Sequence, residues 1–110
     1  MERAILKLLV KVPFAKQEET IEVFNTIMGP LRAHPGLLSA GLYTEIDDDG
    51  LLLLEEWNAR DDLTRHIQST DFKKILAVMD MALEPPVIQF DTVCSRQGLD
   101  LIESLRLKTS

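Results

Sequence analysis

Cysteine is almost absent from this chain of 110 residues, and aromatic residues make up only 5% of it. The single cysteine, Cys94, has no partner for an internal disulfide, and no cluster of cysteine and histidine around it suggests a metal site. We therefore expect Cys94 to be a small buried residue. Glycine and proline number five each, too few for a collagen-like or low-complexity chain.

The sequence also lacks long apolar runs and any excess of positive charge. No stretch approaches the roughly 18 apolar residues of a membrane span, and the first residues show no apolar signal-peptide core. We therefore expect a cytoplasmic protein. The formal net charge of −6, without a basic stripe, indicates that neither nucleic acid nor an anionic membrane is a partner.

What remains is the composition of an ordinary globular domain, with 45% hydrophobic and 27% charged residues. A chain of this length forms one domain, and its folding buries on the order of 65% of the surface that the unfolded chain exposes. The sequence therefore predicts a core of modest size.

A run of four leucines, residues 51–54, lies at the centre of the pattern. Asp47-Asp48-Asp49-Gly50 precedes it and Trp57 ends it, so we expect a strand over 51–57 that is covered on both faces. The Asp-Gly turn predicts a hairpin with a strand over 37–46. Because the chain passes from this strand straight into helices, we expect the single tryptophan to lie where the sheet meets helices.

Two helices are expected after this strand. The Asn58 side chain can cap a helix that starts at Ala59, and this helix carries His66. A second start signal at Ser69-Thr70 begins another helix, whose apolar residues recur at helical spacing until Pro85-Pro86 ends it.

Periodicity predicts three further elements. Residues 3–12 alternate between apolar and polar positions, which is typical of a strand. Residues 17–33 carry one apolar helix face, which Gly29-Pro30 should weaken and His34-Pro35-Gly36 should end. Residues 87–94 alternate again and predict a fourth strand.

This order of elements is that of a split βαβ, or ferredoxin-like, α+β fold: a four-stranded antiparallel sheet with helices on one face. Residues 1–95 form this domain, and residues 96–110 follow as a C-terminal amphipathic tail. The other sheet face needs a cover, which a homodimer of stacked sheets would supply, with the tail either covering part of the face or clasping the partner subunit. The apolar residues expected on that face are Ile5, Leu9, Leu37, Tyr43, Leu51, Leu53, Val87 and Val93.

Several segments, taken in order, resemble one known family. His34-Pro35-Gly36-Leu37 and Gly41-Leu42-Tyr43 are similar to a turn and a second strand, and Glu55-Glu56-Trp57 to the end of a third strand. Leu63–Phe72 is similar to a helix that carries leucine, histidine, serine and phenylalanine, and Glu84-Pro85-Pro86 precedes the last strand. The set resembles the antibiotic biosynthesis monooxygenase (ABM) domain family, whose members form dimeric α+β barrels.

The resemblance implies oxygenation of a phenolic or quinol-like small molecule in a pocket between the sheet and the helices. It also implies that no metal, flavin or haem is needed, so no cofactor is expected. The alternative is a non-catalytic module of the same dimeric fold that binds a small aromatic molecule or haem. A third possibility is an interaction protein whose tail, Leu99–Leu107, faces the partner.

Trp57 and His66 are the pair expected to carry the chemistry. A tryptophan can stack on a flat aromatic ligand, and a nearby histidine can take a phenolic proton to leave an electron-rich phenolate that reacts with oxygen. The alternative is structural: Trp57 packs at the junction of sheet and helix, and His66 is a partly exposed helix residue.

Three further residues are candidates for binding the substrate. Tyr43 can orient a ligand through its hydroxyl, or lie in the dimer interface. Asn58 is a binding residue or a helix cap, and Arg60 either neutralises a developing oxyanion or lies in solvent. Glu55 and Glu56 are not expected to act as a carboxylate pair, because consecutive strand residues point to opposite faces.

Overall fold

The structure is a computed structural model that describes residues 2–46 and 48–109. Met1, Asp47 and Ser110, which belong to the predicted domain, hairpin turn and tail, lie outside the described residues. The elements are, in chain order, β1 (Arg3–Lys11), α1 (Phe14–Arg32), β2 (Leu37–Thr44), β3 (Gly50–Trp57), α2 (Arg60–Gln68), α3 (Phe72–Asp80), β4 (Val87–Val93) and α4 (Leu99–Thr109).

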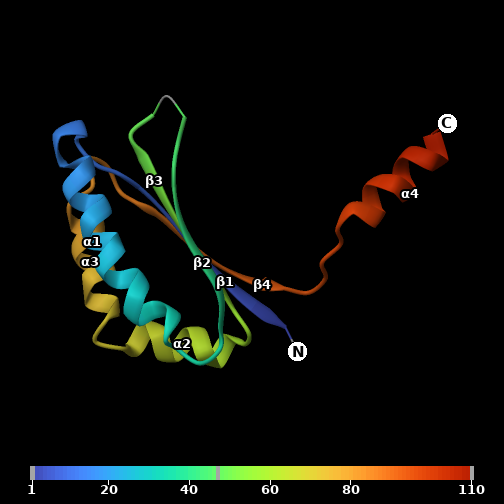
Figure 1. The fold of residues 1–110 in the computed structure, drawn as a ribbon, viewed down its shortest axis with the longest axis horizontal. Helices are drawn as coiled ribbons and strands as arrows, with labels where there is room; N and C mark the ends of the chain where they lie inside the picture. Colours follow the sequence, from blue (N-terminus) through green and yellow to red (C-terminus); the bar gives the residue numbers. More distant parts are fainter. Residues whose placement is uncertain (1, 47, 110) are drawn as a thin grey trace.

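One four-stranded antiparallel sheet, in the order β2-β3-β1-β4, forms the body of the molecule. Figure 1 shows α1, α2 and α3 gathered on one side of this sheet, whereas α4 extends away from it after β4. The predicted ferredoxin-like α+β fold is therefore confirmed. The division into a domain and a tail stays a prediction.

The core lies between the sheet and the three helices. Because successive strand residues point to opposite faces, the even positions of β1 turn toward the helices and are at most 2% exposed. They meet buried residues of β3 and of each covering helix. The apolar core consists of Ala4, Leu6, Leu8, Val10, Val12, Phe24, Ile27, Met28, Leu31, Leu51, Leu53, Trp57, Leu63, Phe72, Ile75 and Val78.

The leucine-rich strand β3 is covered on one face only in the described chain. Leu51 and Leu53 are fully buried beneath the helices, whereas Leu54 on the opposite face is 37% exposed. Cover on the second face of β3 stays a prediction, whereas the assignment of Leu51 and Leu53 to the uncovered face was wrong. The cause is the register: Trp57 pairs with the inward-facing Ala4, which turns every second residue before Trp57 inward as well.

Leu37 was also assigned to the wrong face. It pairs with Trp57 and packs against the core, because a bulge between Leu37 and Ser39 shifts the alternation of β2. The same bulge leaves Leu38 46% exposed.

Helix α1 starts before the expected residue 17 and includes Pro30. The Gly29-Pro30 pair does not break it, because the buried residues Met28 and Leu31 on either side hold this last turn against the sheet. The turn that follows contains Gly36 at a φ of 92°, a conformation that favours glycine. None of the described helices is long and apolar enough to cross a membrane.

Cys94 is exposed, contrary to the expectation of a buried thiol. Strand β4 ends at Val93, so Cys94 already belongs to the segment that leaves the sheet. Helix α3 likewise ends at Asp80, ahead of the expected stop at Pro85-Pro86.

Candidate functional site

Trp57 and His66 meet on the helix-covered side of the sheet. Trp57 is the last residue of β3, and His66 lies in the last turn of α2. Their rings stack with centroids 4.9 Å apart and planes 27° apart. Trp57 is 0% exposed and His66 only 1%, so His66 is not the partly exposed residue of the structural alternative.

The local structure explains this meeting. Trp57 pairs with Ala4 of β1, and the small alanine side chain leaves room for the indole on the inward face. In α2, Leu63 and His66 are three residues apart and form its buried side. Phe72 at the start of α3 closes the site from another side, with its ring edge-on to His66 at 5.3 Å.

Glu55 is a third member of the site, and the sequence reasoning gave it no role. It lies two residues before Trp57, on the same inward face of β3, and is fully buried. Its Oε1 accepts a hydrogen bond of 3.0 Å from the Trp57 indole N–H and lies 3.3 Å from Nε2 of His66. We call Glu55, Trp57 and His66 the Glu55 cluster.

Three polar atoms of the Glu55 cluster have no hydrogen-bond partner among the described residues: Glu55 Oε2, His66 Nδ1 and His66 Nε2. The 3.3 Å contact permits electrostatic attraction, but it is not aligned as a hydrogen bond. Leaving a buried polar atom unpaired costs roughly 1–3 kcal/mol. Groups of this kind in a core require an explanation, and a catalytic or binding role is one.

His34 lies between the Glu55 cluster and solvent. It comes from the turn after α1, and its side chain is 28% exposed. Its ring centroid is 5.7 Å from that of His66 and 6.0 Å from that of Trp57, in edge-on contacts. On its outer side, Nε2 is 3.8 Å from Oδ2 of Asp71, the residue before α3. His34 is thus the part of the site nearest to solvent.

The other predicted site residues do not join the cluster. Asn58 does not cap α2, because Ala59 is the N-cap residue and no side chain makes a capping hydrogen bond to this helix. The backbone N–H of Asn58 instead donates a hydrogen bond of 2.7 Å to the backbone oxygen of Gly36. Arg60 begins α2 and is exposed. Tyr43 is 54% exposed and pairs with Leu52 on the uncovered sheet face. Their roles in substrate binding stay predictions.

Glu56 points to the uncovered face, where arginines surround it. Its Oε1 is 3.5 Å from Nη1 of Arg3 and also pairs with Nη2 of Arg96. The hydrogen bond from Arg96, and then the charges of Arg96 and Arg3, hold the pKa of Glu56 below its usual value. Among residues 2–46 and 48–109, no three His, Cys, Asp or Glu side chains are arranged to hold a metal ion.

The fold and the Glu55 cluster define a small ferredoxin-like domain with a polar site beneath its helices. Residues 5–78 match the sequence model of the family described as antibiotic biosynthesis monooxygenase. Because this match covers more than half of the chain, the protein belongs to the ABM family, as the resemblance indicated. Membership connects it with monooxygenase-like or small-molecule-binding function.

A relative by sequence also matches most of this chain. An uncharacterized protein of Synechocystis is 30% identical over 92 residues, which are 82% of this chain and 63% of that protein. The chain thus spans less than two thirds of that relative's length.

Two solved structures share the fold. A conserved protein of Methanosarcina mazei has a TM-score of 0.76 at 22% identity, over 83% of this chain and 92% of the other. A protein of Nitrosomonas europaea, provisionally named an antibiotic biosynthesis monooxygenase, has a TM-score of 0.75 at 17% identity, over 87% of this chain and 94% of the other.

Proposed function

We propose that this protein is a cofactor-independent monooxygenase that oxidises a phenolic or quinol-like small molecule at the Glu55 cluster. The observation that supports this most is a buried carboxylate and imidazole, 3.3 Å apart and stacked against an indole, in a chain of the ABM family. Buried ionisable pairs of this kind are typical of catalytic sites.

His66 is the proposed proton acceptor. The Glu55 carboxylate beside Nε2 favours a proton on that nitrogen, which leaves the lone pair of Nδ1 free to take the phenolic proton. Nδ1 has no partner among the described residues, so it is available for this step. The Trp57 indole N–H holds the Glu55 carboxylate in place beside the imidazole through its hydrogen bond to Oε1.

The phenolate formed in this step is the reductant for dioxygen. The substrate loses its phenolic hydrogen and the one hydrogen of the reacting ring carbon, that carbon gains one oxygen atom as a carbonyl, and the second oxygen atom leaves with the two hydrogens as water. All four electrons come from the substrate, so no added reductant is required. The chain's residues supply the base and a buried setting from which water is excluded.

The cluster is closed in this conformation, so the substrate requires a movement of the cover to reach it. Trp57 and His66 are buried, and His34 and Asp71 lie on the solvent side, from the turns before β2 and α3. We place the opening between these two turns. Motions of loops over active sites are common among enzymes.

Oxygen uptake by the purified, metal-free protein tests the proposal, with a panel of quinols and polycyclic phenols as substrates. We expect consumption without added metal, flavin or haem, and a loss of about tenfold or more in His66→Ala. Gln68→Ala is the matched control, because Gln68 is exposed on the same helix. Absence of oxygen uptake across the panel would overturn the proposed monooxygenase activity. Full activity in His66→Ala would overturn the assignment of the active site to the Glu55 cluster.

The same unpaired atoms support a second candidate, a module that binds a small aromatic molecule or haem without turnover. Haem titration followed by absorbance distinguishes it. A saturable signal together with a silent oxygen electrode would favour binding over catalysis.

The homodimer is part of the proposal as well. The uncovered sheet face carries a row of apolar residues that water would otherwise contact, and a second copy stacked on this face would bury them. A monomeric mass by light scattering at micromolar concentration would contradict the dimer. The residues of the uncovered sheet face that a second copy would bury are Ile5, Leu9, Tyr43, Leu52, Leu54, Val87 and Val93.

A further inference from the structure

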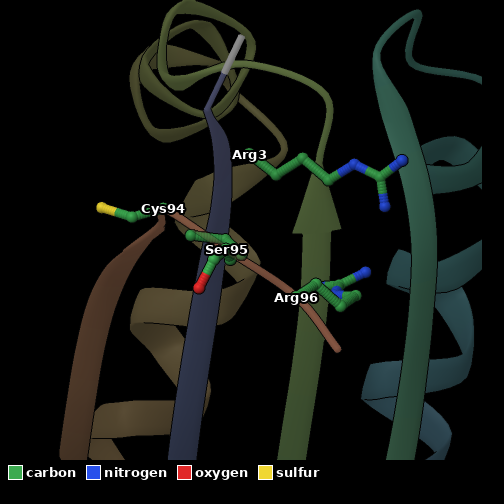
Figure 2. A pocket seen from close by; sticks show the side chains of 5 residues that line it. Arg3, Cys94, Ser95 and Arg96 are labelled. Atoms are coloured by element: carbon green, nitrogen blue, oxygen red, sulfur yellow. The ribbon is translucent and has the colours of Figure 1, made fainter. Parts of the chain in front are cut away.

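The sheet shields the Glu55 cluster from the uncovered face. Figure 2 shows the side chains around a cavity at the ends of β1 and β4, where Arg3 pairs with Val93 on that face. The next residue of β1, Ala4, faces the helices and pairs with Trp57, so the sheet lies between this cavity and the cluster. A small molecule that reaches Trp57 and His66 must therefore pass between the elements on the helix side.

On the helix side, the side chain of His34 separates the cluster from solvent. Its ring centroid lies 6.0 Å from that of Trp57 and 5.7 Å from that of His66, and both of these rings are buried behind it. Its Nε2 lies 3.8 Å from Oδ2 of Asp71. Among the described residues, the Asp71 carboxylate is the one polar group that this side chain contacts. His34 thus covers two rings of the site and is tied to Asp71 alone.

The backbone on both sides of this contact is held by hydrogen bonds. The N–H of His34 donates to the backbone oxygen of Leu31 at 3.1 Å, and its carbonyl accepts a hydrogen bond of 3.3 Å from Leu37. The carbonyl of Asp71 accepts one of 3.2 Å from Lys74 in the first turn of α3. Rotation of the His34 side chain is therefore the smallest movement that uncovers the cluster, and partly exposed side chains change rotamer readily.

We propose that the contact between His34 and Asp71 controls access to the Glu55 cluster, and that a positive charge on His34 strengthens it. A neutral imidazole attracts a carboxylate weakly, whereas an imidazolium forms an ion pair with it. Histidine side chains ordinarily titrate near pH 6.5 and aspartate side chains near 3.9, so both ordinarily carry charge at about pH 5. The cluster therefore opens less readily in mild acid than above neutrality.

Other ionisable groups also lie close to His34. His66 faces its inner side, with Glu55 behind, and the Asp62 carboxylate of α2 lies against the turn that carries His34. Arg65 pairs with Asp62 and balances its charge. These groups stay in place when Asp71 is replaced. The contribution of the contact is therefore the effect of replacing Asp71, measured with and without His34.

The fluorescence of Trp57, the single tryptophan of the chain, measures the opening without a substrate. Because Trp57 is buried, a quencher in solution reaches it in proportion to the fraction of molecules that are open. Acrylamide is the probe, since it is uncharged and the charges of the contact do not attract or repel it. The lifetime-corrected quenching constant of the parent chain should be about two- to fivefold higher at about pH 8 than at about pH 5.

Single variants assign this difference to the contact. Asp71→Asn should raise the quenching constant in acid to the value that the parent chain shows in alkali. The substitution removes no capping hydrogen bond from α3, because the Asp71 side chain makes none. Asp80→Asn is the matched control, since it removes the same charge from an exposed residue at the other end of α3. It should leave the pH difference unchanged, and loss of the difference in Asp80→Asn would overturn the assignment to Asp71.

A double variant shows whether the two residues act together. In the His34→Gln background, Asp71→Asn should leave the quenching constant unchanged, because the contact is already lost. An equal rise in both backgrounds would overturn the proposal, since Asp71 would then act through the start of α3 rather than through His34.

The inference rests on the proposed function only for the kind of molecule that enters, a phenol or quinol. Acrylamide quenching requires no turnover, so the two proposals fail in different ways. The expected quenching without oxygen uptake would support control of access and overturn the oxygenase. Oxygen uptake together with equal quenching of the parent chain in acid and alkali would overturn control of access by His34 and Asp71.

Discussion

The two faces of the sheet give opposite environments to two neighbouring glutamates. Glu55 is fully buried against an indole N–H and an imidazole, whereas Glu56 lies at the surface between two arginines. Both belong to β3, and they differ in environment because consecutive strand residues point to opposite faces of the sheet. The comparison shows that the face, and not the residue type, decides what a carboxylate can do here.

The energetic consequence differs as much as the geometry. On the helix-covered face, an ionisable group that loses its partner stays in a medium of low dielectric, and this costs several kcal/mol. On the uncovered face, solvent screens the same loss, and exposed ion pairs contribute about 0–1 kcal/mol. Substitutions at the two glutamates should therefore have widely different effects on the free energy of unfolding.

The largest effect is expected for Glu55→Ala. This change leaves the buried Trp57 N–H without its acceptor, removes the carboxylate that lies 3.3 Å from His66 Nε2 and opens a cavity, so it should lower the free energy of unfolding by about 2–5 kcal/mol. Glu56→Ala should lower it by about 1 kcal/mol or less. Urea unfolding of both variants measures the contrast, and equal losses would break the comparison between the two faces.

Trp57→Phe should have a smaller effect on the same face. It keeps an aromatic ring in the core but removes the N–H that bonds Glu55 Oε1 at 3.0 Å, so about 1–3 kcal/mol of unfolding free energy should be lost. The proposed function adds a fall in oxygen uptake of about tenfold or more. An unchanged unfolding midpoint would mean that this hydrogen bond contributes nothing to the cluster.

Most of the fold could be predicted because periodicity reports directly on which face a strand or helix buries. The alternation of β1 gives its core side correctly. In α3 the helical spacing indicates the buried Phe72 and Ile75, whereas Leu76 at similar spacing is 48% exposed. The alternation of β3 could not be read from its four leucines, which look alike on both faces. The bulge after Leu37 has no sequence signal of comparable strength.

The site was only half predictable for a related reason. Trp57 and His66 stand out as rare residue types in the chain, whereas Glu55 is one of many acidic residues. A signal for Glu55 was present, since it shares its strand face with Trp57 and Leu53. That signal gains meaning only when the inward face of β3 is known, which requires the register with β1.

The smallest effect concerns the uncovered face and pH. Arg96 and Arg3 lower the pKa of folded Glu56, so the unfolded chain binds a proton there more readily than the folded chain does. The resulting stabilisation is present above the usual glutamate pKa of 4.5 and is lost as pH falls through the lower, folded value. Glu56→Gln should therefore reduce stability slightly at neutral pH, by about 1 kcal/mol or less, and should match the parent chain once the pH is below both values. Urea unfolding across the acidic range measures this convergence. A difference that persists at the lowest pH would show that Glu56 acts through packing, in which case the two sheet faces would differ less than their charges suggest.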